Sequence, residues 1–367
     1  MNGLALGVMT GTSVDAIDTA LISIKEGKPL SLLSFFSNPF SKKQKQEIIS
    51  LQNIGGNEVH RCSLVSNKLS TKISSSINLL LKKENINRRD ILVAGIHGQT
   101  IRHKPEDGYT VQLCNPAIVA QATGITVVHD FRTRDIVRGG QGAPLTPLFH
   151  KEISDTSESC AFVNVGGLAN VTLISNFSNK ITEVDSGFDT GPGNCLSDLW
   201  ITEVLKKPFD ERGGWAKSGI PNKKLLKIML RDPFFKKNPP KSVSKEYFDL
   251  NWLTKQLKLL KIELSDQDIQ ATVVELVSIT ITDAIPKRYT KIYVCGGGEK
   301  NDYLIDRMMV HAGRKIISTA CLGWPPESIE AACFAWLATK TLAGDDFPLK
   351  GITGSRANGK IGSITLA

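Results

Sequence analysis

One short pattern occurs twice in this chain, near its start and about halfway along. The first copy spans residues 4–24 and turns at Gly11-Thr12-Ser13, and the second spans residues 160–174 and turns at Gly166-Gly167. Each copy predicts an apolar strand, a glycine turn and a second apolar strand. Because a glycine turn lets backbone N–H groups approach an anion closely, the repeat indicates a phosphate held by two related half-chains.

The length and the order of predicted elements favour two α/β domains. A chain of 367 residues is most simply two domains. Strands alternate with helices after each turn, which predicts mixed sheets flanked by helices. We place the boundary near residue 130, so that the domains are residues 1–130 and 131–367. An apolar helix predicted at residues 326–342 is a candidate to cross back to the first domain.

Several further elements are predicted from apolar runs between turn residues. They are strands at residues 91–96, 109–113, 126–128 and 291–295, and helices at residues 116–123, 195–206 and 266–285. Residues 130–147 are predicted to be a long loop, rich in glycine, proline and charge. Loops of that length are usually functional.

Charge and composition exclude several classes of protein. The net charge is +9, but the lysines are dispersed and do not alternate with aromatic residues, so a solvated surface is favoured over nucleic-acid binding. No apolar stretch is long enough to cross a membrane, and the N-terminus lacks a secretion signal, so we expect a cytoplasmic protein without a membrane partner. The seven cysteines are odd in number and lack a C-x-x-C pair, which predicts reduced thiols and no zinc site.

The first turn also carries two carboxylates, Asp15 and Asp18. A carboxylate beside a phosphate turn repels the phosphate unless a cation lies between them. Either aspartate is therefore a candidate Mg²⁺ partner, directly or through water. The alternative is an ordinary hairpin in which the aspartates cap the turn.

The segment from Asp185 to Asn194 is the densest in chemical groups. We predict a glycine-rich turn that holds Asp185 and Asp189 directly before a helix, where the helix N-terminus can bind an anion. Asp189 could serve as a base toward a water or a hydroxyl. The alternative is a plain helix cap, but Asn194 is better placed for that role.

Two weaker signals follow buried strands. Gly296-Gly297-Gly298 would let the backbone pass close to the flat part of a nucleoside, although such runs often simply end a strand. His97-Gly98-Gln99-Thr100 follows the strand at residues 91–96, at the kind of position where α/β proteins bind ligands. A structural histidine is at least as well supported as an acid–base or sugar-binding one. The chain contains no P-loop, no dinucleotide-binding glycine motif and no nucleophile elbow.

Taken together, the segments resemble the anhydro-N-acetylmuramic acid kinases, a family of the sugar-kinase, actin and Hsp70 ATPase superfamily. The resemblance spans nearly the whole chain and rests on seven segments in order: residues 9–15, 97–100, 130–135, 139–144, 164–170, 189–194 and 325–331. It implies an α/β fold of two related actin-like, ribonuclease-H-like ATPase domains with a nucleotide cleft between them. It also implies a homodimer.

The resemblance further implies an activity and a set of site residues. The enzyme would use ATP, Mg²⁺ and water to convert 1,6-anhydro-N-acetylmuramic acid to N-acetylmuramic acid 6-phosphate in peptidoglycan recycling. Asp189 would be the catalytic base, and Thr100, Arg134 and Glu330 would hold the sugar, where an arginine suits its lactyl carboxylate. ATP would be bound by Gly11, Thr12, Ser13, Val14, Asp15, Ala16, Ile17, Asp18, Gly166, Gly167, Asn170, Gly296, Gly297 and Gly298, and Mg²⁺ by Asp15 and Asp18.

Three other functions compete with this one. They are another kinase of the same superfamily, a nucleotide-driven binding module like Hsp70, and a basic nucleic-acid binder. Activity on N-acetylglucosamine but not on the anhydro sugar would favour the first. ATP hydrolysis without sugar would favour the second, and salt-sensitive retention of DNA the third.

Overall fold

The computed structural model describes residues 2–11, 13–154, 158–177, 181–244 and 247–367. The chain divides into two compact units, Met1–Ile153 with Ser328–Ala367, and Ser154–Glu327. By their contacts, residues 131–153 belong to the first unit. The boundary predicted near residue 130 had placed them in the second domain. The reason is that α5 (Thr146–Ile153) packs on α12 (Ile329–Ala343), the C-terminal helix of the first unit.

The first unit is built on a six-stranded sheet in the order β13-β7-β4-β1-β2-β3. β1 pairs antiparallel with β2 and parallel with β4, β4 pairs parallel with β7, and β2 pairs antiparallel with β3. The strands are β1 (Gly3–Met9), β2 (Ala16–Ile24), β3 (Ser31–Pro39), β4 (Ile91–Ile96), β7 (Val127–His129) and β13 (Ser363–Thr365). β5 (Gln99–Lys104) and β6 (Tyr109–Leu113) form a separate two-stranded sheet.

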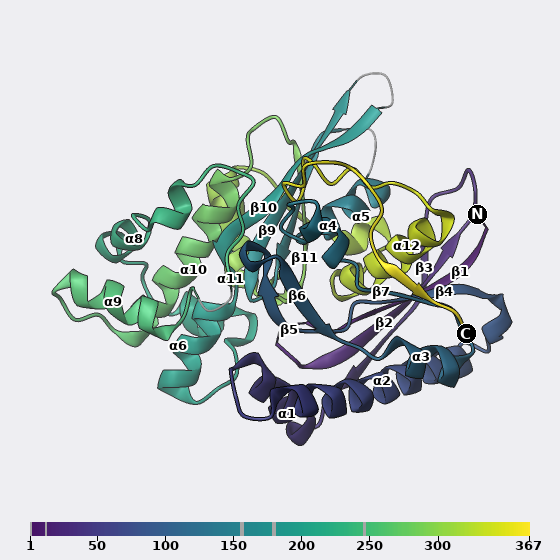
Figure 1. Ribbon diagram of the computed structural model, residues 1–367. Helices are drawn as coiled ribbons and strands as arrows, with labels where there is room; N and C mark the ends of the chain where they lie inside the picture. The colour runs from purple at the N-terminus through teal and green to yellow at the C-terminus, as the bar shows by residue number, and fades with distance from the viewer. Residues whose placement is uncertain (1, 12, 155–157, 178–180, 245–246) are drawn as a thin grey trace. The chain divides into compact units, whose positions relative to one another are not determined.

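Helices cover both faces of the first sheet (Figure 1). α2 (Glu58–Lys83) and α3 (Pro116–Thr123) lie against one face, and α12 lies against the other, where it contacts β1 and β4. α12 comes unusually close because Gly7 and Gly95, which are partners in the sheet, leave no side chains between helix and strands. α1 (Lys42–Gln52) packs on α2, and α4 (Thr133–Val137) lies in the segment that precedes α5.

The second unit repeats the strand order of the first. Its sheet has the order β10-β9-β8-β11-β12, with antiparallel pairing from β8 to β10 and parallel pairing from β8 to β12. The strands are β8 (Cys160–Val165), β9 (Leu168–Phe177), β10 (Ile181–Pro192), β11 (Lys291–Cys295) and β12 (Ile316–Ser318). The order and directions match those of β3-β2-β1-β4-β7, so each unit has one α/β sheet that starts with a glycine-turn hairpin. This confirms the predicted fold class of two related domains.

Helices of the second unit include a long, largely buried one, α10 (Asp266–Asp283), which packs on β9 and β10. The others are α6 (Cys195–Leu205), α7 (Gly214–Lys217), α8 (Lys223–Met229), α9 (Leu250–Leu260) and α11 (Asp302–Ala312).

Two local predictions were wrong. Residues 185–192, expected as a glycine-rich turn, lie on β10, because ten of the twelve residues of this strand pair with β9 and two register shifts absorb the irregular stretches. In this strand tertiary pairing overrides the local preference of glycine and proline. The expected loop at residues 130–147 contains α4, and α5 begins within it.

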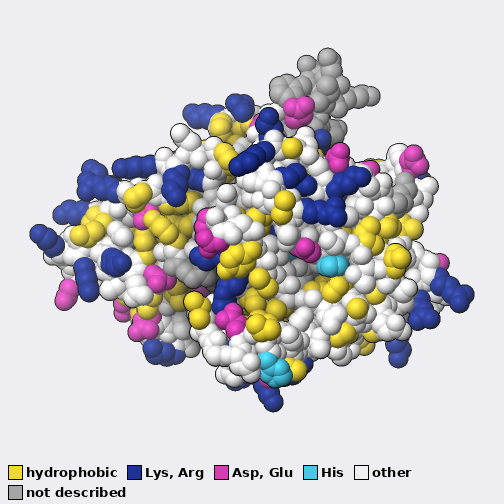
Figure 2. All heavy atoms as spheres, viewed as in Figure 1, with side chains coloured by type: hydrophobic (Ala, Val, Ile, Leu, Met, Phe, Trp, Pro, Cys, Tyr) yellow, Lys and Arg dark blue, Asp and Glu magenta, His cyan; other side chains and the backbone are white. Residues whose placement is uncertain are grey.

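Other expectations can be checked directly. All seven cysteines are free thiols. Within the described ranges, no group of histidine, cysteine and acidic side chains could hold a metal ion by itself. Among the residues that the structure describes, no helix is both long enough and apolar enough to cross a bilayer. Figure 2 shows lysine and arginine side chains scattered among polar and apolar ones on the face in view.

Candidate active site

The first glycine turn joins β1 to β2 and leaves its backbone accessible at Gly11. The N–H of Val14 donates to the carbonyl of Gly11 at 3.1 Å and closes the turn, with Val14 in the left-handed region at φ 54°. The nearest atom to a side chain added at Gly11 would be Oγ of Ser13, at 3.7 Å. This open position fits the close approach of a phosphate. Thr12 lies outside the described residues.

The two acidic residues of this turn have different surroundings. Asp15 forms an ion pair at 2.5 Å with Lys45 of α1, and its side chain is 67% exposed. Asp18 lies on β2 opposite Met9 and is half-buried.

The segment His97–Thr100 is tied to this turn by two hydrogen bonds. The hydroxyl of Thr10 donates to the carbonyl of Gly98 at 2.8 Å, and Nε2 of Gln99 donates to the carbonyl of Gly11 at 3.2 Å. Thr100 lies on β5, is half-buried and accepts a hydrogen bond from Gln112 at 3.2 Å. Thr100, which is expected to bind sugar, thus follows residues that hold the first glycine turn.

The other two expected sugar residues belong to the same unit. Arg134 is on α4, is exposed and has no hydrogen-bond or ion-pair partner among the residues that the structure describes. Glu330 is in the first turn of α12 and is half-buried. Burial lowers the pKa of the neighbouring Arg132, and the negative charge of Glu330 opposes that shift.

Sequence reasoning assigned no role to two residues that organise this region. The guanidinium of Arg132 donates to His97 and to the carbonyl of Gly142 at 2.7 Å. The buried carboxylate of Asp135 accepts from the N–H of Gly142 and from the hydroxyl of Thr353, both at 2.7 Å. Both residues belong to the segment of residues 130–135 that carries the family resemblance, which was the available signal.

The second glycine turn, at Gly166-Gly167, packs against the start of α6. The N–H groups of Asn194 and Cys195 donate to the carbonyls of Gly166 and Gly167 at 2.8 and 3.0 Å. These amides are therefore engaged within the protein and do not form the anion site expected at this helix. Asn194 is the N-cap residue as expected, but its side chain makes no cap bond and donates to the carbonyl of Val165 at 3.4 Å.

The triple glycine lies beside this second turn. A side chain at Gly296 would overlap Oδ1 of Asn164, and one at Gly298 would overlap Cγ1 of Val165. At Gly297 the nearest atom is Nδ2 of Asn194, at 3.9 Å, so the middle glycine leaves space above the backbone. The folded unit thus brings together both groups of residues expected to bind ATP in this half of the chain.

One row across the second sheet joins these residues to Asp189. In register, Asp189 of β10 is opposite Asn170 of β9, Asn170 is opposite Asn164 of β8, and Asn164 is opposite Cys295 of β11, directly before the triple glycine. Partners in register present their side chains on the same face of a sheet. The buried Oδ1 of Asn170 has no hydrogen-bond partner among the described residues.

Asp189 itself is half-buried and anchored on one side. Its Oδ2 accepts from the N–H of Val243 at 3.0 Å, and its own N–H donates to the carbonyl of Lys241 at 3.0 Å. Burial raises the pKa of Asp189 to about 7, although the Val243 N–H and the Lys241 charge act in the opposite direction. A carboxyl group with a pKa near neutrality is suited to accept a proton at physiological pH.

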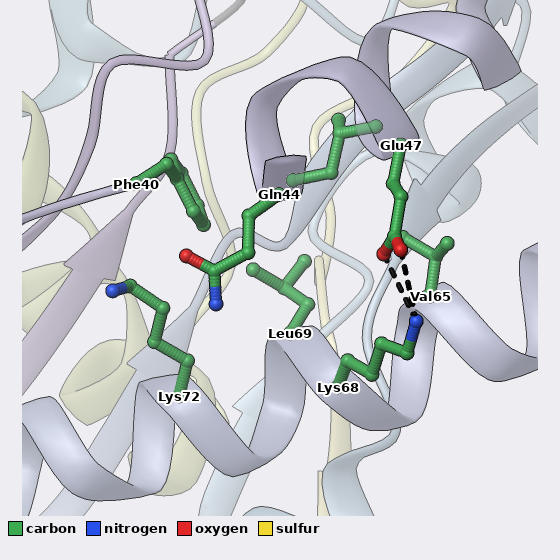
Figure 3. A pocket seen from close by; sticks show the side chains of 8 residues that line it. Phe40, Gln44, Glu47, Val65, Lys68, Leu69 and Lys72 are labelled. Atoms are coloured by element: carbon green, nitrogen blue, oxygen red, sulfur yellow. Dashed lines mark hydrogen bonds and ion pairs between the residues drawn. The ribbon is translucent and has the colours of Figure 1, made fainter. Parts of the chain in front are cut away.

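Two hollows, one between α1 and α2 and one over α2, are lined by none of these residues. A cavity of 20 Å³ between α1 and α2 has room for about one water and is crossed by the Lys68–Glu47 ion pair at 3.0 Å (Figure 3). An open hollow of 370 Å³ over α2 contains none of the expected site residues; it is lined by Thr71, Ser74, Ser75, Asn78, Leu79, Lys82 and Ala122.

The duplicated sheet, with one glycine turn in each unit, defines an actin-like α/β protein. The sequence model of the anhydro-N-acetylmuramic acid kinase family matches residues 3–367. The chain belongs to this family.

Relatives that carry the family name are similar over almost their whole length. The kinase of Nitrosomonas europaea is 38% identical over 366 residues, covering 98% of each chain. That of Pseudomonas putida is 38% identical, covering 98% of this chain and 99% of the relative. One from Coxiella burnetii is 37% identical, covering 98% and 96%. The resemblance inferred from the seven segments is therefore confirmed.

Proposed function

We propose that this chain is an ATP-dependent kinase that hydrolytically opens 1,6-anhydro-N-acetylmuramic acid and phosphorylates it to N-acetylmuramic acid 6-phosphate in peptidoglycan recycling. Support comes from the family match over residues 3–367 and from the relatives named as anhydro-N-acetylmuramic acid kinases. The observation that carries the chemistry is Asp189, a buried carboxyl with a raised pKa in the same row as Asn170.

Asp189 is the proposed catalytic base. Its Oδ2 is held by Val243, and Oδ1 has no hydrogen-bond partner among the described residues. Oδ1 would take a proton from a water that attacks the anomeric carbon of the sugar. The bond from that carbon to the 6-oxygen breaks, and the 6-oxygen takes the γ-phosphoryl group of ATP, releasing ADP. Water, sugar and ATP thus give N-acetylmuramic acid 6-phosphate and ADP, and the proton taken up by Asp189 is released to solvent.

The sugar is assigned to Thr100, Arg134 and Glu330. Arg134, exposed and unpaired among the described side chains, can form two parallel hydrogen bonds with a carboxylate such as the lactyl group. Thr100 can exchange its bond with Gln112 for one to a sugar hydroxyl. Glu330 can accept from a hydroxyl or amide of the sugar.

ATP is assigned to the two glycine turns and to the triple glycine, and Mg²⁺ to the acidic residues of the first turn. Mg²⁺ needs only one or two carboxylates because phosphate oxygens and waters complete its shell, and it would neutralise charge on the phosphates. Asp15→Asn and Asp18→Asn should each raise the Mg²⁺ concentration for half-maximal ADP release. No change in either variant would contradict the assignment of Mg²⁺ to this turn.

We also propose a cytoplasmic homodimer. Light scattering at micromolar concentration should give twice the chain mass of 40.0 kDa. A single-chain mass at all concentrations tested would exclude the dimer.

The deciding experiment is an ADP-release assay with 1,6-anhydro-N-acetylmuramic acid, repeated in ¹⁸O-water with mass analysis of the product. Phosphorylated sugar carrying ¹⁸O at the anomeric hydroxyl, read in a fragment ion before exchange, is expected. N-acetylglucosamine serves as the control acceptor. Absence of ADP release with the anhydro sugar would reject the proposed substrate.

A further inference from the structure

His97 directly follows β4, and both nitrogens of its imidazole are hydrogen-bonded. The side chain is 4% exposed. Nδ1 is 2.7 Å from the carbonyl of Gly98, and Nε2 is 3.1 and 2.8 Å from Nε and Nη2 of Arg132. A carbonyl only accepts and a guanidinium only donates. The ring is therefore neutral, with its proton on Nδ1.

This ring is linked to every residue proposed to bind the sugar. Thr100 lies three positions further along the chain. Arg132 donates to the ring and to the Gly142 carbonyl, and Arg134 follows two residues later on α4. On the other side, the ring lies 4.7 Å from Phe334, which is one helical turn after Glu330 on α12.

The first glycine turn, which is proposed to bind ATP phosphates, is held by other hydrogen bonds. Thr10 donates to the Gly98 carbonyl, and Gln99 donates to the Gly11 carbonyl. Neither bond involves Nε2 of His97. A change at Nε2 should consequently disturb the sugar residues more than the turn proposed to bind ATP.

We propose that His97 is a positioning residue that holds Thr100, the Arg134 segment and the Glu330 helix in the arrangement that binds the sugar. This inference rests on the proposed function, since it concerns the same sugar. The three groups come from parts of the chain far apart in sequence, and small displacements of positioning groups are costly for catalysis. The neutral imidazole accepts from Arg132, which also donates to the Gly142 carbonyl, and its ring contacts Phe334 of α12.

Two substitutions separate the bond to Arg132 from the bond to Gly98. His97→Asn keeps an N–H near the position of Nδ1 but removes the Nε2 acceptor of Arg132, which then keeps only its bond to the Gly142 carbonyl. His97→Gln reaches further and places an amide oxygen near the position of Nε2. Sugar affinity should be measured by calorimetry without nucleotide, and the KM for sugar and for ATP by ADP release.

His97→Asn should raise the sugar dissociation constant and KM by about tenfold or more, as expected when a buried charged donor loses two of its hydrogen bonds. The ATP KM should change by less than about twofold, and His97→Gln should restore sugar affinity to within about threefold of the wild type. Equal losses in the two variants, or parallel losses of sugar and ATP affinity, would overturn the inference.

Sugar binding by the wild-type protein separates the test of this inference from the test of the proposed function. If it does not bind the sugar, the proposed function fails and the inference with it. If it binds the sugar and His97→Asn binds equally well, only the inference fails. Nitrogen NMR of the wild type needs no variant: the neutral Nδ1–H form of His97 is expected at pH 7, and an Nε2–H or charged ring would overturn it.

Discussion

The main-chain N–H of Val243 donates to Oδ2 of Asp189 at 3.0 Å, across 54 positions of sequence. The bond fixes one oxygen of a half-buried carboxyl. It also opposes, without cancelling, the rise in the pKa of Asp189 to about 7 that burial causes. The result is a carboxyl group that is oriented and whose proton affinity is matched to neutral solution.

Replacing Asp189 by asparagine should lower turnover by roughly 10²–10⁴, because the amide keeps the shape but cannot accept the proton. ATP binding, measured by calorimetry, should remain largely intact. Asp185→Asn is the matched control on the same strand, because Asp185 is bonded to Ser175 and Tyr289 and has no proposed role in the reaction. Near wild-type turnover in Asp189→Asn would reject Asp189 as the base.

The pH dependence of kcat/KM should follow the ionisation of Asp189. Only the ionised carboxylate can act as the base, and its pKa is about 7. Activity should therefore rise tenfold per pH unit below that value and level off above it. A flat profile from pH 5 to 7, with the protein folded throughout, would contradict the assignment.

The same pKa predicts how stability depends on pH. Between the ordinary value of 3.8 and about 7 the folded state holds a proton that the unfolded chain has released. The free energy of unfolding should thus fall as pH rises through this window. Asp189→Asn removes this contribution, so its Tm should fall less than that of the wild type between pH 5 and 8. Parallel Tm curves would show that Asp189 ionises normally.

A methyl group at either paired glycine under α12 should destabilise the first unit. A side chain at Gly7 would overlap the carbonyl of Ala331, and one at Gly95 would overlap the carbonyl of Phe334. Gly7→Ala or Gly95→Ala should reduce the free energy of unfolding by about 1–3 kcal/mol or more, measured by denaturant titration. Gly56→Ala, with no atom within 4 Å, is the control and should change it little. Equal effects would refute this account of helix packing.

Two arginine–carboxylate pairs of the second unit should differ in their importance for stability. Arg307 donates at 2.6 and 2.8 Å to Glu275, whose side chain is 8% exposed. Arg307→Met leaves a buried carboxylate to which, among the described residues, only His311 is still bonded, and should cost about 3–5 kcal/mol. Arg212→Met breaks the exposed pair with Asp302 and should cost about 0–1 kcal/mol. Chemical denaturation of both variants provides the comparison.

Elements formed by local apolar runs were predictable from the sequence. The strands β4, β6, β8 and β11 and the helix α3 have the predicted bounds, because turn residues flank each of them. Residues 185–192 of β10 were not predicted as strand, since their glycines suggest a turn and only pairing with β9 makes them extended. The glycine turns, Asp15, Asp18 and Asp189 were singled out from the residues themselves. Thr100, Arg134 and Glu330 came from the family resemblance, and all these roles remain predictions.

The sequence by itself determined the duplicated hairpins and the glycine turns, because each is encoded by a short stretch of chain. It also determined the family, because seven such stretches occur in order along it. Only the tertiary structure decided that Asp189, Asn170 and Asn164 share one row of a sheet. It alone also decided that Nε2 of His97 accepts a hydrogen bond from Arg132. It also decided the pKa of Asp189. These properties depend on burial and on partners distant in sequence, so they arise only when the chain is packed.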